Sequence, residues 1–257
     1  MMLTAKDIKL QAGDKLLCDD FNIEIEPGQS WAILGLNGAG KTTLLHTLAG
    51  IREANQGTVG LENKILTEWS QQQLAQHIGL LLQTHQDPFP GTVIEYVLIG
   101  RHPYLGHFSW ESDQDYAIAQ QALDMVGLNG LEQRDIQQLS GGEYQRMMIA
   151  MVLVQQPEFY LLDEPVNHLD WPHQHELLKT LNELTQRKSV SLVMALHDVN
   201  LAARYCSHVV MMFEDSEYLL GKTSKLLNRE NLERLYKTAM HELEDGDQTV
   251  FVPANSN

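Results

Sequence analysis

The sequence predicts an α/β fold with a mainly parallel central sheet, an N-terminal antiparallel β layer and an inserted helical subdomain. Four short, nearly continuous apolar runs predict strands that are buried on both faces, at residues 31–34, 78–82, 159–162 and 191–196. Helical patterns separate these runs, and such an alternation is typical of α/β proteins. Residues 21–26 instead alternate apolar and polar side chains before a Pro-Gly turn, which predicts a half-exposed strand of an antiparallel layer.

The length and composition predict a single domain. The chain of 257 residues is 43% hydrophobic, which is enough to bury a sizeable core. Between residues 83 and 157 the pattern becomes helix-rich, and one helical face is expected to hold Tyr116, Ala119, Leu123 and Val126. We therefore expect one domain, residues 1–257, with a core of residues 1–83 and 157–257 and an inserted helical subdomain of residues 84–156.

The composition and the N-terminal segment argue against several classes of protein. Residues 1–15 mix charges with isolated aliphatic side chains and lack the apolar region of a signal peptide, so we expect the chain to stay in the cytosol. The longest purely apolar stretch, residues 147–154, is far shorter than the roughly 20 residues that span a bilayer. A formal net charge of −16 argues against nucleic-acid binding, because a phosphate-binding face needs clustered Lys and Arg.

A glycine-rich motif predicts a phosphate-binding loop. Residues 35–42 read Gly-Leu-Asn-Gly-Ala-Gly-Lys-Thr and match the P-loop pattern, directly after an apolar strand and before a predicted helix. The glycines let backbone N–H groups turn inward around phosphate oxygens, the helix N-terminus adds a favourable dipole and Lys41 adds a charge. Thr42 is expected to hold Mg²⁺. A glycine-rich turn with a solvated lysine is the alternative. The residues expected to bind nucleotide here are Gly35, Asn37, Gly38, Ala39, Gly40, Lys41, Thr42 and Thr43.

Two acidic residues follow the apolar run at 159–162. Asp163 and Glu164 are expected at the carboxyl edge of the sheet beside the phosphate-binding loop, where ligands bind in such folds. Phosphoryl transfer needs one acid to anchor the hydrated metal ion and another group to position the attacking water. Asp163 suits the first role and Glu164 the second. The alternative is a polar exit from the strand in which Glu164 caps a turn.

A second glycine motif indicates the family. Residues 139–146 read Leu-Ser-Gly-Gly-Glu-Tyr-Gln-Arg and precede a strongly apolar helix. This segment resembles the LSGGQ-type signature of ABC ATPases, and the order of the motifs along the chain is that of the family. Ser140, Gly141 and Gly142 at a helix N-terminus form a second anion site that presents donors to the γ-phosphate of ATP. A simple helix cap is the alternative.

The resemblance implies further functional residues and the cofactors ATP and Mg²⁺. Gln83 matches the family's Q-loop, which contacts Mg²⁺ and responds to the permease. Asp170 ends the segment that matches the D-loop, which lies across the dimer interface. His197 matches the switch histidine that contacts the γ-phosphate. The residues implied in catalysis are thus Glu164, His197, Gln83 and Lys41. A histidine satisfied by the backbone and a helix N-cap are the alternatives for His197 and Asp170.

Three positions depart from the family pattern. Ala12 stands where the family usually stacks an aromatic side chain on adenine, so adenine contact is expected to be weak or to come from elsewhere. Tyr144 stands where many members carry Arg or Gln, and Val166 where Thr or Ser is common. Neither of these two touches the expected phosphate donors, so we expect tuning of the activity and not its loss.

Two local segments indicate a subfamily. Residues 99–104, Ile-Gly-Arg-His-Pro-Tyr, and residues 197–205 resemble segments of the ATPases of iron–siderophore, haem and cobalamin importers. The resemblance implies a homodimer of ATPase subunits, transmembrane permease subunits and a periplasmic substrate-binding protein, at the cytoplasmic face of a bacterial inner membrane. The alternatives are a soluble ABC-type ATPase scaffold of iron–sulfur cluster assembly, a DNA-repair or translation ATPase, and an inactive regulator.

Overall fold

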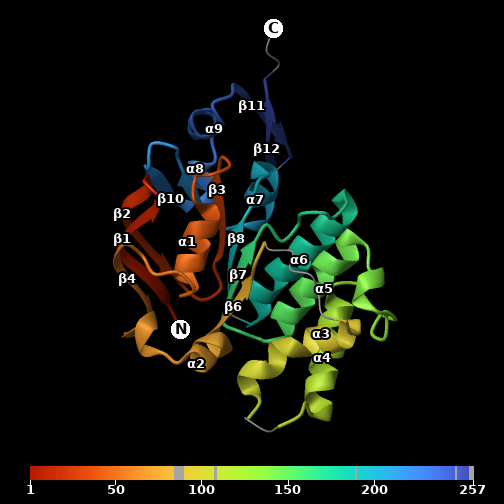
Figure 1. Ribbon diagram of the computed structural model, residues 1–257. Coiled ribbons are helices and arrows are strands. Elements are labelled where there is room, and N and C mark those ends of the chain that lie inside the picture. Colours follow the sequence, from red (N-terminus) through yellow and green to blue (C-terminus); the bar gives the residue numbers. More distant parts are fainter. Residues whose placement is uncertain (84–89, 107–108, 189, 247, 255–257) are drawn as a thin grey trace.

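The computed structural model describes residues 1–83, 90–106, 109–188, 190–246 and 248–254 (Figure 1). Its centre is a six-stranded sheet in the order β10-β9-β3-β8-β7-β6. Neighbouring strands run parallel except at the edge, where β10 pairs with β9 antiparallel. All four predicted apolar runs form strands of this sheet. The six strands are β3 Ser30–Gly35, β6 Ile78–Leu81, β7 Phe159–Asp163, β8 Ser191–Ala195, β9 His208–Met212 and β10 Tyr218–Lys222.

A separate antiparallel sheet precedes and flanks the central one, as predicted. Its order is β2-β1-β4-β5, with β1 Leu3–Ala12, β2 Lys15–Ile25, β4 Gln56–Leu61 and β5 Lys64–Ile65. Phe21, Ile23 and Ile25 are buried and alternate with exposed polar residues, as the period of two requires. Helix α1, Lys41–Leu48, lies between this layer and the central sheet (Figure 1). Burial of apolar side chains on both of its sides therefore holds α1 in place.

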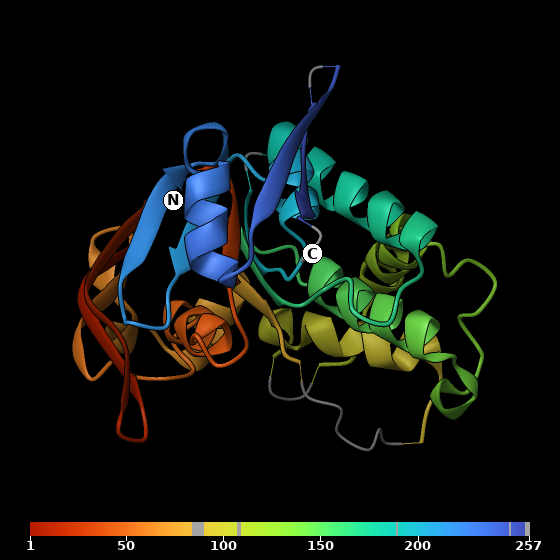
Figure 2. The same ribbon diagram turned by 90° about the horizontal axis from the view of Figure 1, so that it is seen from above.

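The helices α3 Val93–Leu98, α4 Asp113–Met125 and α5 Gly141–Val154 pack against one another beside the sheet (Figure 2). Each begins at a Ser or Thr whose hydroxyl and whose backbone N–H both bond to the residue three positions on, a capping box. This group is the predicted helical subdomain. Its boundaries at residues 84 and 156 stay a prediction, and residues 84–89 lie outside the described part of the chain.

The other elements complete the element order. Short 3₁₀ turns are η1 Leu66–Glu68, η2 Ile99–Tyr104 and η3 Ile136–Gln138. The remaining helices and strands are α2 Gln71–His77, α6 Trp171–Lys188, α7 Val199–Tyr205, α8 Thr223–Leu226, α9 Arg229–Tyr236, and the C-terminal hairpin β11 Met240–Asp245 with β12 Gln248–Pro253. In the described residues, no helix has the length and apolar character that crossing a membrane requires.

Three of the four residues expected on one face of the helical segment that includes α4 are buried, and the fourth is not. Ala119, Leu123 and Val126 are buried, but Tyr116 is 48% exposed and its neighbour Asp115 is buried instead. Nε of Arg101 donates to Oδ1 of Asp115 at 2.7 Å. This charge-assisted pair satisfies Asp115 inside the protein, and its neighbour Tyr116 lies towards solvent.

The segment of η2 that resembles the importer ATPases is packed against α5. A Cβ atom at Gly100 would overlap the carbonyl oxygen of Met151 and lie 2.5 Å from Cγ1 of Val154, so only glycine fits this approach. Arg101 donates a second hydrogen bond, from Nη1 to the carbonyl oxygen of Val154 at 3.1 Å. The glycine and the arginine therefore fix η2 on α5.

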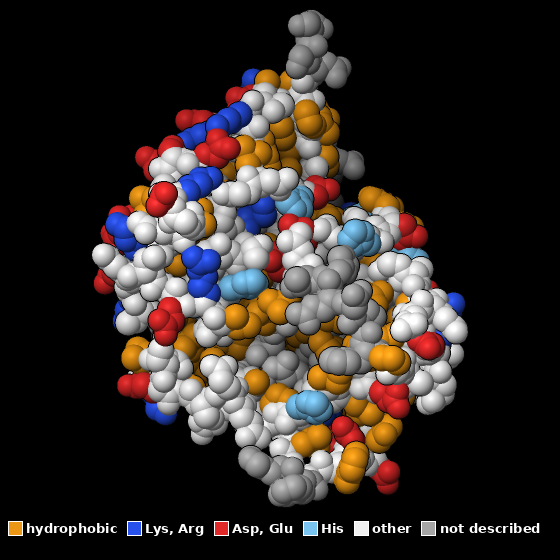
Figure 3. Space-filling view, viewed as in Figure 1, with side chains coloured by type: hydrophobic (Ala, Val, Ile, Leu, Met, Phe, Trp, Pro, Cys, Tyr) orange, Lys and Arg blue, Asp and Glu red, His pale blue; other side chains and the backbone are white. Residues whose placement is uncertain are grey.

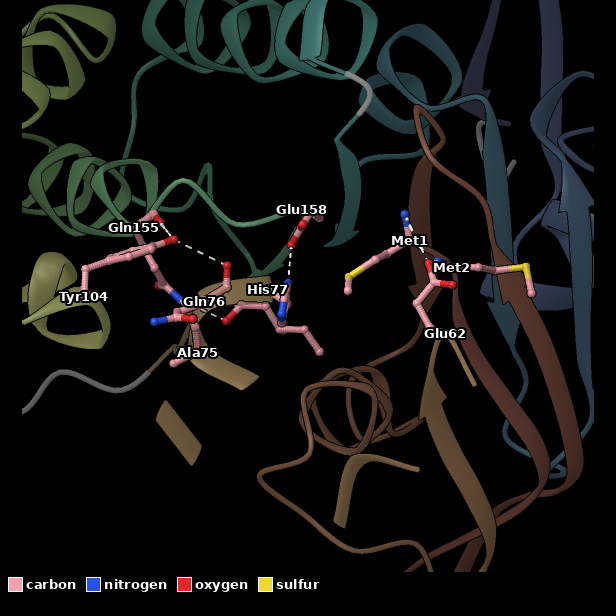
Figure 4. Close-up of polar contacts among 10 residues, drawn as sticks. Met1, Met2, Glu62, Ala75, Gln76, His77, Tyr104, Gln155 and Glu158 are labelled. Atoms are coloured by element: carbon pink, nitrogen blue, oxygen red, sulfur yellow. Dashed lines mark hydrogen bonds and ion pairs between the residues drawn. The ribbon is translucent and has the colours of Figure 1, made fainter. Parts of the chain in front are cut away.

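Hydrogen bonds join these helices to the region of α2 and β6 (Figure 4). The Tyr104 hydroxyl donates to the carbonyl oxygens of Gln155 at 2.9 Å and Gln76 at 3.4 Å. Nε2 of Gln155 donates to the carbonyl oxygen of Ile78 at 2.9 Å, and His77 bonds to Glu158 at 2.7 Å. Because β6 leads directly to Gln83, these bonds help to position a predicted site residue.

Charged side chains of both signs share the surface. On the face shown in Figure 3, Lys and Arg are interspersed with Asp and Glu, and hydrophobic side chains gather towards its centre.

Cys18 and Cys206 are buried free thiols, and burial raises the pKa of Cys18 to about 11. The thiolate, which is the reactive form, is therefore disfavoured at neutral pH.

Candidate nucleotide-binding and hydrolysis site

The P-loop joins the end of β3 to the start of α1. Gly40, the N-cap of α1, has φ 104° and Gly38 has φ 76°, both in the region that favours glycine. A Cβ atom at Gly35 would lie 2.7 Å from the carbonyl oxygen of Met212 on the neighbouring strand. The glycines are therefore required by the backbone itself, and they bring the loop to the N-terminus of a helix, where anions bind.

Lys41 is buried at the base of this loop, with 6% of its surface exposed. Its Nζ donates to the carbonyl oxygens of Gly35 at 2.9 Å and Leu36 at 3.3 Å. Burial lowers the pKa of Lys41, and the nearby carboxyl groups of Glu164 and Asp163 oppose this effect. The Lys41 ammonium group is thus held at the P-loop by the carbonyl oxygens of Gly35 and Leu36.

Asp163 ends β7 and is almost completely buried, with 1% exposed. Neither of its carboxylate oxygens has a hydrogen-bond partner of good geometry among the described residues. Burial raises the pKa of Asp163, although the Thr42 side chain acts in the opposite direction. A cavity of about 480 Å³ borders Asp163, Thr42 and Gln83. Two buried carboxylate oxygens without partners, beside a hydroxyl and an amide oxygen, suit a hard cation such as Mg²⁺.

Glu164 is fixed by three other side chains. Its Oε1 lies 2.7 Å from Nε2 of His197, and its Oε2 accepts from Nε2 of Gln83 at 2.7 Å and from Nδ2 of Asn167. Its backbone has φ 51°, a left-handed conformation that costs a non-glycine residue about 1 kcal/mol or more. The short turn after β7 and the three hydrogen bonds therefore hold the Glu164 carboxylate in one orientation.

A second cavity, of about 510 Å³, lies over the P-loop. Ala12 and Leu17 line it, as do Asn37, Gly38, Gly40, Lys41, Thr42, Thr43, Gln83, Glu164 and His197. Most predicted P-loop residues thus share one cavity with Gln83, Glu164 and His197. Gly35 and Ala39 do not line it, because Gly35 packs against β9 and Ala39 is buried in the core. Ala12 does lie at the cavity, in place of an aromatic ring, with Leu17 as a further apolar surface.

The signature residues lie elsewhere. Ser140 caps α5, accepting from the backbone N–H of Glu143 at 3.3 Å, and is exposed, as is Gly141. A Cβ atom at Gly142 would meet the carbonyl oxygen of His168 at 3.3 Å. Asp170 accepts from His173 and borders neither of the two cavities. The fold of one chain therefore does not bring Ser140, Gly142 and Asp170 to the P-loop.

Sequence reasoning placed Asn167 only in the segment that matches the D-loop, and it gave Leu17 no role. Asn167 bonds to Glu164, and Leu17 packs against Gly40, where a Cβ atom would lie 2.9 Å from Cδ1 of Leu17. The signal for Asn167 was its spacing, three residues after Glu164, in a turn whose N–H bonds to the Glu164 carbonyl at 3.2 Å. No sequence pattern predicted that Leu17 lies at this site, because its position depends on how β2 packs over the P-loop.

Comparison with known proteins agrees with this geometry. Residues 18–167 match the family described as ABC transporter. The chain is 35% identical over 235 residues to the petrobactin import ATP-binding protein of Bacillus anthracis, covering 91% of this chain and 86% of that protein. It is 36% identical over 235 residues to the ferric enterobactin transport ATP-binding protein of Escherichia coli, covering 91% and 86%.

A solved structure extends the agreement to the whole fold. A structure described as a metal-chelate type ABC transporter in an inward-facing conformation superposes with a TM-score of 0.85 at 29% identity, and covers 98% of this chain and 97% of that chain. The fold and the site thus define an ATP-binding and ATP-hydrolysing protein. The chain belongs to the ABC transporter family, as a member of its ATPase components.

Proposed function

We propose that the chain is the ATP-hydrolysing subunit of an ABC importer. It works as a cassette dimer that couples hydrolysis to the uptake of a metal chelate through a separate membrane permease. The observation that carries this proposal is the Glu164 carboxylate, held by Gln83, Asn167 and His197 in the cavity that the P-loop also lines. This is a constellation for activating water beside bound phosphates.

The roles of the site residues follow from their positions. The backbone N–H groups of residues 35–43 and the Lys41 ammonium bind the phosphates of ATP. Thr42, Gln83 and Asp163 hold Mg²⁺, which when bound neutralises charge that develops on the phosphates. Glu164 accepts a hydrogen bond from the attacking water and orients it. His197, which follows the neighbouring strand β8, holds Glu164 and faces the γ-phosphate.

Dimerisation completes the site. Ser140, Gly141 and Gly142 form an exposed helix N-terminus, an anion-binding feature that lines neither cavity of its own chain. In a closed two-fold arrangement, this N-terminus of one chain covers the ATP bound at residues 35–43 of its partner. Asp170 is exposed and comes two residues after His168, whose carbonyl oxygen lies near Gly142, so we place Asp170 at the same interface.

The transport function rests on the relatives and on the η2 segment. The relatives named above are import or transport ATP-binding proteins for petrobactin and ferric enterobactin, and a third is the hemin import ATP-binding protein of Escherichia coli, at 36% identity over 250 residues. We therefore favour an iron–siderophore or haem as the imported chelate, and these relatives disfavour an iron–sulfur assembly scaffold. Two permease subunits and a periplasmic substrate-binding protein complete the complex, with the chain at the cytoplasmic face of the inner membrane.

Copurification tests this proposal. The tagged chain is purified from detergent-solubilised membranes, and the partners are identified by mass spectrometry. We expect a polytopic permease, and an ATPase rate in the reconstituted complex that a metal chelate with its binding protein stimulates. Recovery of soluble iron–sulfur assembly proteins, without a permease, would overturn the importer assignment.

A further inference from the structure

His46 lies beside the proposed metal site, and no predicted role includes it. It stands four residues after Thr42 on α1, which places both side chains on the same face of the helix, one turn apart. Helix α1 packs against β7, the strand that ends at Asp163. His46 borders the cavity of about 480 Å³ together with Thr42, Gln83 and Asp163. Thr42 and His46 therefore lie on one face of α1, and both border the cavity that the proposed metal residues line.

Three buried polar atoms belong to residues that border this cavity. Nε2 of His46 and the two carboxylate oxygens of Asp163 are buried from solvent and have no hydrogen-bond partner of good geometry among the residues that the structure describes, although the Thr42 side chain lies near Asp163. His46 is also close enough to Asp163 to act on its carboxyl group electrostatically. Buried polar atoms without partners are rare in native proteins, because each one loses its hydrogen bonds to water on folding. Three such atoms on two residues that border one cavity indicate a ligand that forms hydrogen bonds with all of them.

A hydrated cation is a ligand of this kind. Mg²⁺ usually keeps several of its waters when a protein binds it, and these waters are polarised hydrogen-bond donors. A carboxylate accepts such bonds, and so does the ring nitrogen of a neutral imidazole that carries its proton on the other nitrogen. The unpaired groups at this cavity can therefore be satisfied by a metal ion together with its water.

We propose that His46 is a positioning residue for the divalent cation, and that its Nε2 accepts a hydrogen bond from a water bound to the Mg²⁺ held by Thr42 and Asp163. This inference rests on the proposed ATPase function. We expect replacement of His46 to change the affinity for Mg²⁺ and to leave the phosphate contacts of the P-loop unchanged. Replacing a residue that hydrogen-bonds to a ligand of a metal ion typically changes the affinity for the metal by about 10- to 100-fold.

The test measures Mg²⁺ affinity without turnover. Binding of a non-hydrolysable ATP analogue is followed by calorimetry over a series of free Mg²⁺ concentrations, and the half-saturating Mg²⁺ concentration is compared between variants. His46→Leu removes the acceptor. The amide of Gln reaches the position of Nε2, so His46→Gln restores an acceptor there, whereas the shorter Asn amide reaches only the position of Nδ1. His102→Leu, at an exposed histidine that borders neither of the two cavities, is the matched control.

We expect His46→Leu and His46→Asn to raise the half-saturating Mg²⁺ concentration about tenfold. The affinity for the analogue in EDTA, and the properties of His46→Gln and His102→Leu, should stay near those of the wild type. Equal Mg²⁺ requirements in wild type and His46→Asn would overturn the inference, and this comparison remains available if the Leu variant does not fold. A wild type whose analogue binding ignores Mg²⁺ would overturn the proposed metal site itself.

Discussion

Nε2 of His197 lies 2.7 Å from Oε1 of Glu164, although the two residues follow different strands of the central sheet. Glu164 comes directly after β7, and His197 comes just beyond β8, its parallel neighbour. Parallel strands end at the same edge of a sheet, so their following residues meet there. This contact sets the orientation of the carboxylate that the proposed reaction needs.

Replacing Glu164 by Gln should stop turnover and keep ATP binding. The amide is the same size but cannot accept a proton or hold the attacking water as a carboxylate does, while Lys41 and the P-loop are unchanged. We expect the hydrolysis rate to fall by about 10²- to 10⁴-fold, measured as phosphate release. Glu230→Gln, at an exposed carboxylate on α9 that borders neither cavity, is the control. Turnover of Glu164→Gln within a few-fold of wild type would contradict the assigned role.

The P-loop lysine is expected to be essential for nucleotide binding. Lys41→Ala removes the buried cation that neutralises phosphate charge, and backbone donors alone hold that charge weakly. We expect no measurable binding of a fluorescent ATP analogue at concentrations that saturate the wild type. Lys9→Ala, at a partly buried lysine that pairs with Asp19, should bind normally. Near-normal affinity of Lys41→Ala would show that the cavity over the P-loop is not the nucleotide site.

The composite site predicts that ATP drives dimerisation. In the Glu164→Gln background, ATP should shift the protein from monomer to dimer in sedimentation velocity. Adding Ser140→Arg should block this shift and leave ATP binding to the monomer intact, because Ser140 is exposed and lines neither cavity.

The simpler role of Ser140 makes a different prediction. If this residue only caps α5, Ser140→Ala costs about 1 kcal/mol of stability and leaves activity unchanged. A double variant, Glu164→Gln with Ser140→Arg, that dimerises as well as its parent would refute the composite site.

The Arg101–Asp115 pair should make stability depend on pH in the acid range. Hydrogen bonds from Ser112, supported by Arg101, lower the pKa of Asp115 from 3.8 to about 2. Because the folded pKa is the lower one, the stabilisation is fully present above 3.8 and is lost as the pH falls towards 2. Asp115→Asn should therefore lower the urea unfolding free energy at pH 7, and the difference from wild type should narrow near pH 3. A difference that stays constant with pH would mean that the ionised carboxylate is not what stabilises this region.

Much of the fold was predictable because its signals are local. Strands buried on both faces need continuous apolar runs, and a tight phosphate-binding turn needs glycine at Gly38 and Gly40, where φ is positive. The acids at the end of β7 and the histidine after β8 were also predictable, since each follows a recognisable strand. The exposure of Tyr116 shows the limit of such signals. The helical period places both Tyr116 and Asp115 near a buried face, and only the position of Arg101, on another segment, decides which one is buried.

The sequence by itself determined the fold class, four strands of the central sheet, the P-loop and the family, because a motif or a hydrophobic period can be recognised in a few consecutive residues. Only the tertiary structure decided which side chains meet. Asn167 and Gln83 share one oxygen of Glu164, and His46 borders the same cavity as Asp163, because the turn after β7, the end of β6 and helix α1 pack at one edge of the sheet. The separation of Ser140 from the P-loop within one chain is likewise a result of packing. Contacts between residues far apart in sequence depend on how whole elements pack, and no local pattern carries that information.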